Sequence, residues 1–180
     1  MIDPARWDVA ALAAAFRAHT LSPVEALAAL RARIDRWEPV IHALVAADRP
    51  AAESDAATAA AQSEARWRRG EPLGPLDGIP VTVKENLART GVPMRAGCAG
   101  ATPVVPTRDA PAVERLREAG AVIVGATTMP DWGMLSSGVS SLHGITRSPW
   151  DPALTTGGSS AGAGAAAVAA YGLAGRVGRR

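Results

Sequence analysis

Two short apolar segments separated by a helical one most constrain the fold of this chain. Residues 79–83, with the sequence IPVTV, are rich in β-branched side chains and predict a strand. Residues 109–120 carry Val113 and Leu116 on one helical face and end in Gly120. Residues 121–125, AVIVG, predict a second strand. Because both strands are apolar, we expect them to be buried, and the order strand, helix, strand predicts an α/β layer.

Two helices are predicted before residue 40. Residues 8–18 place Leu12 and Phe16 one turn apart on the same face. The sequence SPVE at residues 22–25 forms a capping box with proline at the first helical position. We expect this second helix to run toward Trp37 and to stop before Pro39, because proline cannot donate a helical hydrogen bond.

A third helix and a long loop complete the pattern. Residues 51–69 are alanine-rich, and Gly70 supplies a helix stop. Residues 41–46 form a short apolar run that fits either a strand or an extended connection. Residues 88–108 hold three glycines and three prolines and predict a loop, after which Asp109 is expected to cap the next helix.

Composition excludes several classes of protein. The chain of 180 residues is 48% hydrophobic and 20% charged, which is typical of a globular protein. A net charge of +2, with one dense basic run at residues 176–180, argues against a nucleic-acid partner. Cys98 is alone and no apolar run reaches membrane-spanning length, so we expect a cytoplasmic protein without a membrane partner. His19, His42 and His143 are scattered, and the sequence predicts no metal or cofactor.

Lys84 is the first candidate for chemistry, because it follows the first predicted strand directly. Burial disfavours the charged ammonium form, so a desolvated lysine can serve as a base. The alternative is a lysine that extends from the strand end into water. Asp77 and Glu85 flank this segment, and we expect them to form salt bridges or turn contacts rather than to act as general acids.

A glycine- and serine-rich turn is the second candidate. Residues 156–164 read TGGSSAGAG, where paired glycines allow unusual backbone angles and a serine can cap the helix that follows. A phosphate-binding loop is excluded because no Gly-Lys-Ser/Thr ending is present. The nucleophile-elbow pattern G-x-S-x-G is also absent, since the glycines at 158 and 162 have the wrong frame.

These segments together resemble the amidase signature family. Residues 76–86, LDGIPVTVKEN, resemble its lysine motif, and residues 157–162, GGSSAG, resemble its G-G-S-S-G-G motif. Residues 113–128 are similar to the helix and strand that end in G-x-T-N, and SPWDP at residues 148–152 is similar to N-P-W-D-P. The resemblance implies that residues 1–170 are the N-terminal portion of a single domain, with a mixed central sheet covered by helices and incomplete here. Residues 171–180 depart from the family as a divergent tail.

The resemblance also implies a Ser-Ser-Lys mechanism that needs no cofactor. Lys84 would be the catalytic lysine, and Ser159 would be the bridging serine, preceded by a cis peptide bond. Neutral Lys84 would take a proton from Ser159, and Ser159 would take one from the nucleophile. Ser160 would help to orient the lysine, with Gly157 and Gly158 in supporting positions. The expected substrate is a small-molecule amide.

The nucleophilic serine of this family lies in a later motif, written approximately G-T-D-x-G-G-S-x-R, and no such motif follows Ser160 in these residues. We therefore expect an inactive, truncated portion of an amidase, for which a shifted reading frame is one explanation. The alternatives are a portion of a glutamine-dependent tRNA amidotransferase A-type subunit, which needs partner subunits, and a non-catalytic remnant. The sequence does not determine the oligomeric state, and a homo-oligomer is one of the alternatives.

Overall fold

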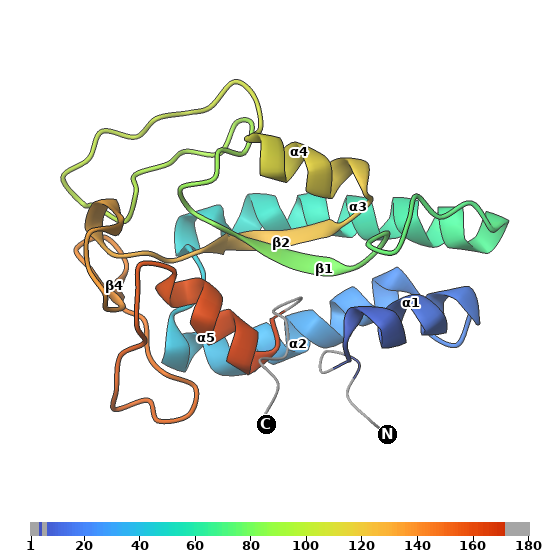
Figure 1. The fold of residues 1–180 in the computed structure, drawn as a ribbon, viewed down its shortest axis with the longest axis horizontal. Helices are drawn as coiled ribbons and strands as arrows, with labels where there is room; N and C mark the ends of the chain where they lie inside the picture. Colours follow the sequence, from blue (N-terminus) through green and yellow to red (C-terminus); the bar gives the residue numbers. More distant parts are fainter. Residues whose placement is uncertain (1–3, 5–6, 172–180) are drawn as a thin grey trace.

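A two-stranded parallel sheet forms the centre of the structure, a computed structural model that describes residue 4 and residues 7–171 (Figure 1). Strand β1 (Pro80–Lys84) pairs with β2 (Val122–Thr127), and the register shifts between Val81 and Thr82. Every residue of β2 is buried. Both predicted strands are confirmed. The predicted divergent tail at 171–180 lies, apart from its first residue, outside the described residues.

Two helices precede the sheet, α1 (Val9–Arg17) and α2 (Pro23–Ile41). The capping box is confirmed, because Ser22 Oγ accepts from the Glu25 N–H at 3.1 Å and Glu25 Oε2 accepts from the Ser22 N–H at 2.8 Å. The predicted stop before Pro39 is wrong, since α2 continues to Ile41. In the last turn a proline removes only one hydrogen bond, and the complete burial of Ile41 keeps that turn in the core.

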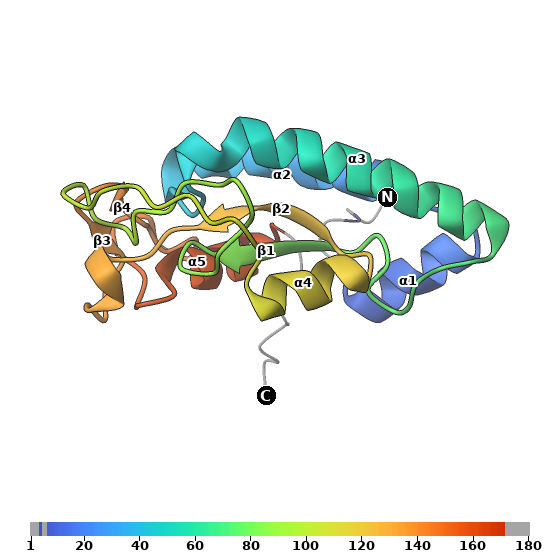
Figure 2. The same ribbon diagram turned by 90° about the horizontal axis from the view of Figure 1, so that it is seen from above.

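One face of the sheet is covered by α2 and α3 (Arg49–Arg69), which follows the short 3-10 helix η2 (Ala46–Asp48) and ends at Gly70 with φ of +72° (Figure 2). Residues 43–45 are the extended connection that the sequence left open. They run antiparallel beside β2, with the Val45 N–H donating to Ala126 O and the Thr128 N–H to Ala43 O, both at 2.9 Å. The sheet region is therefore mixed, as predicted.

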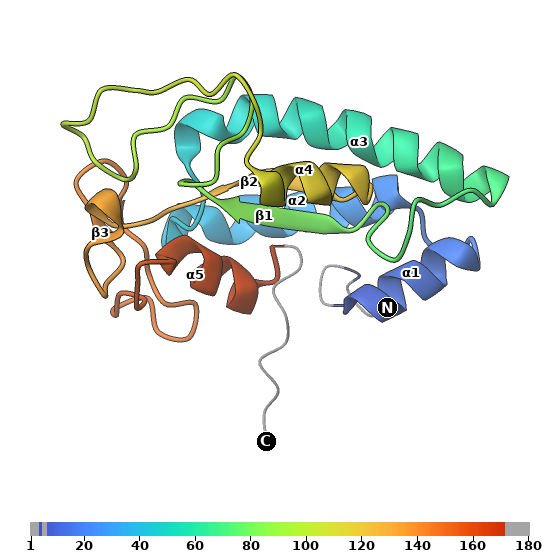
Figure 3. The same cartoon turned by 45° about the horizontal axis from the view of Figure 1, so that its top comes forward.

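The other face of the sheet is covered by α4 (Pro111–Glu118), the helix between β1 and β2 (Figure 3). Val113 is fully buried and Leu116 packs beside it against a cluster that also contains residues of α1 and β1. The predicted cap at Asp109 is wrong, because Ala110 is the N-cap and makes no side-chain capping bond. Asp109 instead accepts from the Thr90 N–H at 2.6 Å and from Arg117 at 2.7 Å, so it fastens the preceding loop to α4.

The last elements were only partly predicted. The 3-10 helix η3 (Asp131–Gly133) leads into an antiparallel hairpin of β3 (Val139–Ser140) and β4 (Gly144–Ile145), which the sequence analysis did not identify. Helix α5 (Ala161–Ala169) lies beside α2, where the Arg33 side chain donates to Ala169 O (Figure 1). No helix within the described residues has both the length and the apolar character needed to cross a bilayer.

Candidate active site

The two leading candidate residues meet where β1 ends and α5 begins. Lys84 is the last residue of β1, and Ser159 lies two residues before α5. Lys84 Nζ donates a hydrogen bond to Ser159 Oγ at 2.8 Å, although the residues are 75 positions apart. Both residues are half-buried, and the Gly158–Ser159 peptide bond is cis, as the resemblance implied. The lysine is thus engaged by a serine rather than extended into water.

The backbone on both sides of Lys84 is anchored to β2. The Glu85 N–H donates to Thr127 O at 3.1 Å, and Thr127 Oγ1 donates to Val83 O at 3.3 Å. The side chains of Val83 and Glu85 are buried. Because these contacts hold the residues before and after Lys84, the lysine side chain starts from a defined place at the carboxyl end of the sheet.

Ser159 is positioned by two close backbone approaches. The Gly162 N–H donates to Thr128 O at 3.0 Å, which joins the first turn of α5 to the end of β2. A Cβ at Gly158 would lie 2.5 Å from Ser137 O and 2.7 Å from Leu135 O, so only glycine fits there. By contrast, a Cβ at Gly157 would meet nothing within 4 Å. Of the two predicted supporting glycines, packing therefore requires Gly158 alone.

Ser160 occupies a different environment from Ser159. It is the exposed N-cap residue of α5, and its side chain makes no capping hydrogen bond, so the expectation that it caps this helix is wrong. Its hydroxyl is directed by neither packing nor a cap bond. The lysine-orienting role implied by the resemblance stays a prediction.

A buried pair of hydroxyl groups near the site was missed by the sequence analysis. Thr128 Oγ1 and Thr146 Oγ1 are 2.7 Å apart, and the Thr146 hydroxyl donates to His42 O at 3.1 Å. Both threonines are almost fully buried. They connect the end of β2 to the segment after β4.

The two acidic residues that flank the lysine segment both have side-chain partners, and the predicted salt bridge is confirmed for Asp77. Asp77 accepts two hydrogen bonds from Arg66, at 2.6 and 2.9 Å. Glu85 Oε2 lies 2.8 Å from His143 Nε2, a contact that was not foreseen. Burial would raise the pKa of Glu85, but His143 and the backbone N–H groups of Gly97 and Arg95 outweigh it, so this pKa lies below its ordinary value.

The remaining candidates gain no role in the site. Cys98 is a free, half-buried thiol in the loop after β1. Within the described part of the chain, no three His, Cys, Asp or Glu side chains cluster in a way that could hold a metal ion.

Sequence comparison places these elements in a known family. The family model described as Amidase matches residues 25–178. The chain belongs to the amidase signature family. It is 35% identical over 167 residues to indoleacetamide hydrolase of Bradyrhizobium diazoefficiens, covering 93% of this chain and 31% of that protein. It is 42% identical over 163 residues to the A-type subunit of glutamyl-tRNA(Gln) amidotransferase from Chloroflexus aurantiacus, covering 90% of this chain and 32% of that protein.

Solved amidase structures share the fold of this chain. The peptide amidase of Stenotrophomonas maltophilia superposes with a TM-score of 0.81 at 32% identity, covering 93% of this chain and 35% of that one. The amidase-family chain therefore spans about a third of the length of its relatives and corresponds to an N-terminal portion of them.

One compositional signal could have selected the site earlier. Lys84 is the sole lysine among the 180 residues of this amidase-family chain, which otherwise uses 18 arginines as its basic residues. Arginine stays protonated at any ordinary pH and cannot serve as a base, whereas lysine can. A single lysine in an arginine-rich chain is therefore a sequence signal that marks Lys84 as a candidate for base chemistry.

Proposed function

We propose that this chain supplies the lysine and the bridging serine of an amide-hydrolysing Ser-Ser-Lys site. The observation that carries the proposal is the 2.8 Å separation of Lys84 Nζ and Ser159 Oγ at the junction of β1 and α5. That separation is short enough for a proton to move between the two atoms. We further propose that residues 1–170 form the N-terminal portion of a single amidase-signature domain.

The proposed reaction uses both groups as a proton relay. Lys84, as a neutral amine, accepts the Ser159 hydroxyl proton while Ser159 Oγ accepts the proton of a nucleophilic serine hydroxyl. That serine belongs to the part of the relatives that lies beyond these residues, and its oxygen attacks the carboxamide carbon. The C–N bond then breaks, and the relayed proton leaves with the amine. Water releases the acyl group by the same route in reverse.

A second candidate function is that of an amidotransferase component that works with partner subunits. It is favoured by the 42% identity to the A-type subunit of glutamyl-tRNA(Gln) amidotransferase, which exceeds the 35% identity to indoleacetamide hydrolase. Against it stands the loop before Gly157, where Ser148, Leu154 and Thr156 depart from the family pattern. We therefore place amide hydrolysis on a small carboxamide first.

The proposal can be tested by restoring a complete domain. Residues 1–170 would be joined to the C-terminal two thirds of the peptide amidase from Stenotrophomonas maltophilia, and ammonia release from carboxamides measured. Lys84→Ala and Ser159→Ala should each lower kcat at least about a thousandfold, because a cooperating triad fails when one member is lost. Lys84→Arg keeps an N–H donor toward Ser159, but the guanidinium stays protonated and cannot accept a proton, so this variant should fail equally.

Two results would redirect the proposal. Turnover within tenfold of the unmodified fusion for Lys84→Ala would remove Lys84 as the base. Ammonia release from glutamine but not from apolar carboxamides would favour the amidotransferase candidate.

A separate experiment distinguishes the amidase and the amidotransferase candidates from a non-catalytic remnant. It sequences the encoding DNA past the Arg180 codon and translates all three reading frames. A G-T-D-x-G-G-S-x-R motif in any frame would support an amidase.

A further inference from the structure

We infer that Glu85 and His143 form a positioning pair that holds Lys84 and Ser159 at hydrogen-bonding distance. The inference deepens the proposed function and rests on it for its catalytic meaning. It assigns neither residue a contact with substrate. Instead, the pair acts by joining the segment that carries Lys84 to the segment that carries Ser159.

The pair begins on the lysine side. Glu85 follows Lys84 directly, and its side chain is only 5% exposed, against 9% for the His143 side chain. Glu85 Oε2 and His143 Nε2 are 2.8 Å apart, and Glu85 Oε1 accepts from the Arg95 N–H at 3.4 Å. Because both side chains are buried, water screens the attraction between them less than it screens a pair on the surface.

His143 lies in the turn of the β3–β4 hairpin, which also holds the segment before Ser159. The Gly138 N–H donates to Thr155 Oγ1 at 3.1 Å, and the Thr156 N–H donates to Thr146 O at 3.2 Å. Gly158 packs against the carbonyl groups of the segment that enters the hairpin. Movement of the hairpin relative to β1 would therefore carry Ser159 away from Lys84.

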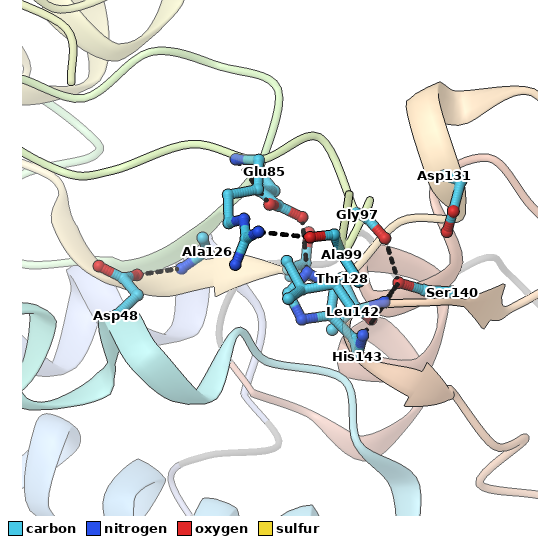
Figure 4. Close-up of polar contacts among 12 residues, drawn as sticks. Asp48, Glu85, Gly97, Ala99, Ala126, Thr128, Asp131, Ser140, Leu142 and His143 are labelled. Atoms are coloured by element: carbon cyan, nitrogen blue, oxygen red, sulfur yellow. Dashed lines mark hydrogen bonds and ion pairs between the residues drawn. The ribbon is translucent and has the colours of Figure 1, made fainter. Parts of the chain in front are cut away.

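The turn that presents His143 is itself fixed. Ser140 Oγ donates to Gly97 O at 2.5 Å and accepts from the His143 N–H at 3.0 Å (Figure 4). The Leu142 N–H donates to Gly97 O at 3.3 Å. Gly97 belongs to the loop after β1, so the hairpin turn and this loop are held together around the Glu85–His143 contact.

Asp131 and Arg95, two other charged groups in this region, have partners of their own. Asp131 accepts from the Ser141 N–H and hydroxyl at 2.7 and 2.6 Å. The Arg95 guanidinium donates to the carbonyl groups of Ala99 and Ala101. His143 is therefore the side chain that engages the Glu85 carboxylate, and substitution of His143 isolates the pair.

The sole lysine makes the inference measurable on the 180-residue chain. Reductive methylation with ¹³C-formaldehyde modifies the amine at Lys84 and the N-terminal amine, which peptide mapping separates. Ser159→Ala removes the hydrogen-bond partner, so Lys84 should be methylated about three to ten times faster, as expected for the loss of one hydrogen bond. His143→Leu should accelerate methylation to a similar extent, and should add less than twofold in the Ser159→Ala background.

Two matched variants separate a loss of Lys84 positioning from a general loss of stability. His143→Gln retains an N–H donor toward Glu85 and should stay within twofold of the unmodified chain. Asp77→Asn breaks a buried ion pair just before the other end of β1, with Arg66, and should leave the methylation rate of Lys84 unchanged. Thermal melts of each variant report the accompanying loss of stability.

The outcomes are distinguishable. The positioning pair is overturned if His143→Leu leaves the rate unchanged, if its effect adds fully to that of Ser159→Ala, or if Asp77→Asn accelerates methylation as much. If Ser159→Ala itself has no effect, the Lys84–Ser159 contact is wrong, and the proposed function fails with it. Acceleration by His143→Leu and Ser159→Ala without additivity supports the inference.

Discussion

Gly162 lies at the closest approach of α5 to the rest of the molecule. A Cβ at this position would overlap the Ala43 carbonyl group and the backbone of Thr128. Gly164, one half-turn further along the same helix, is exposed and would place a Cβ in open space. The two glycines therefore form a matched pair with opposite consequences for substitution.

We predict that Gly162→Ala lowers the free energy of unfolding by about 1–3 kcal/mol, because backbone atoms must move to admit the methyl group. Gly164→Ala should raise it by roughly 0.5–1 kcal/mol, because alanine is the better helix former. Urea unfolding of both variants measures the difference. Equal effects at the two positions would show that the approach of α5 to β2 is not tightly packed.

At the scale of elements, one buried ion pair joins three segments. Asp48 stands at the start of α3, and its Oδ2 accepts from the Ala126 N–H of β2 at 2.8 Å (Figure 4). The same carboxylate pairs with Arg89 in the loop after β1, and both side chains are 3% exposed. The loop is thereby tied to the helix and the strand on which it rests.

Substitution of Asp48 should be costly because it leaves the buried Arg89 charge without a partner. We predict that Asp48→Asn lowers the free energy of unfolding by about 3–5 kcal/mol. Glu118→Gln, in the exposed pair with Arg115, should change it by less than about 0.5 kcal/mol. The double variant Asp48→Asn with Arg89→Met should recover part of the loss. A cost for Asp48→Asn no larger than that of Glu118→Gln would contradict this role.

At the scale of the whole molecule, the buried carboxylates predict sensitivity to acid. The pKa of Glu85 lies below its ordinary value of 4.5, since His143 and backbone N–H groups outweigh the effect of burial. An acid whose pKa is lower in the folded state stabilises the fold above its unfolded pKa, and loses this contribution as pH falls through the folded pKa. Glu38 has the opposite effect on the pH dependence of stability, because burial raises its pKa above the ordinary value.

The contribution of the Glu85 carboxylate to the free energy of unfolding can be isolated by comparison with the Glu85→Gln variant. The difference in urea midpoint between the unmodified chain and this variant should be fully present at about pH 5, above the ordinary pKa of Glu85. It should shrink below pH 4.5, the ordinary value for Glu85. A difference that grows as the pH falls would contradict the sign of the pKa shift. Asp77→Asn should behave alike at lower pH, because its pKa lies below 3.8, with burial outweighed by the bonds from Arg66 and Leu73.

Local patterns in the sequence determined much of this protein. The capping box at Ser22, the helix stop at Gly70 and the two apolar strands depend on neighbouring residues, so they could be predicted. The motifs around Lys84 and Ser159 likewise identified the family and the two residues that meet in the site. The capping box, the helix stop and the strands are governed by backbone propensity and periodicity, which a linear chain displays directly, whereas the two site residues were identified by resemblance to the family's motifs.

Only the tertiary structure decided which distant side chains meet. The Asp48–Arg89 and Glu85–His143 pairs join residues 41 and 58 positions apart, and no spacing rule links such residues. The continuation of α2 through Pro39 follows from burial of Ile41, which outweighs the local preference of proline. Asp109 binds Thr90 and Arg117 instead of capping α4, because those partners come within reach only after the loop has folded. Burial and charge pairing between remote segments are properties of the packed chain, and they set the surroundings in which Lys84 and Ser159 meet.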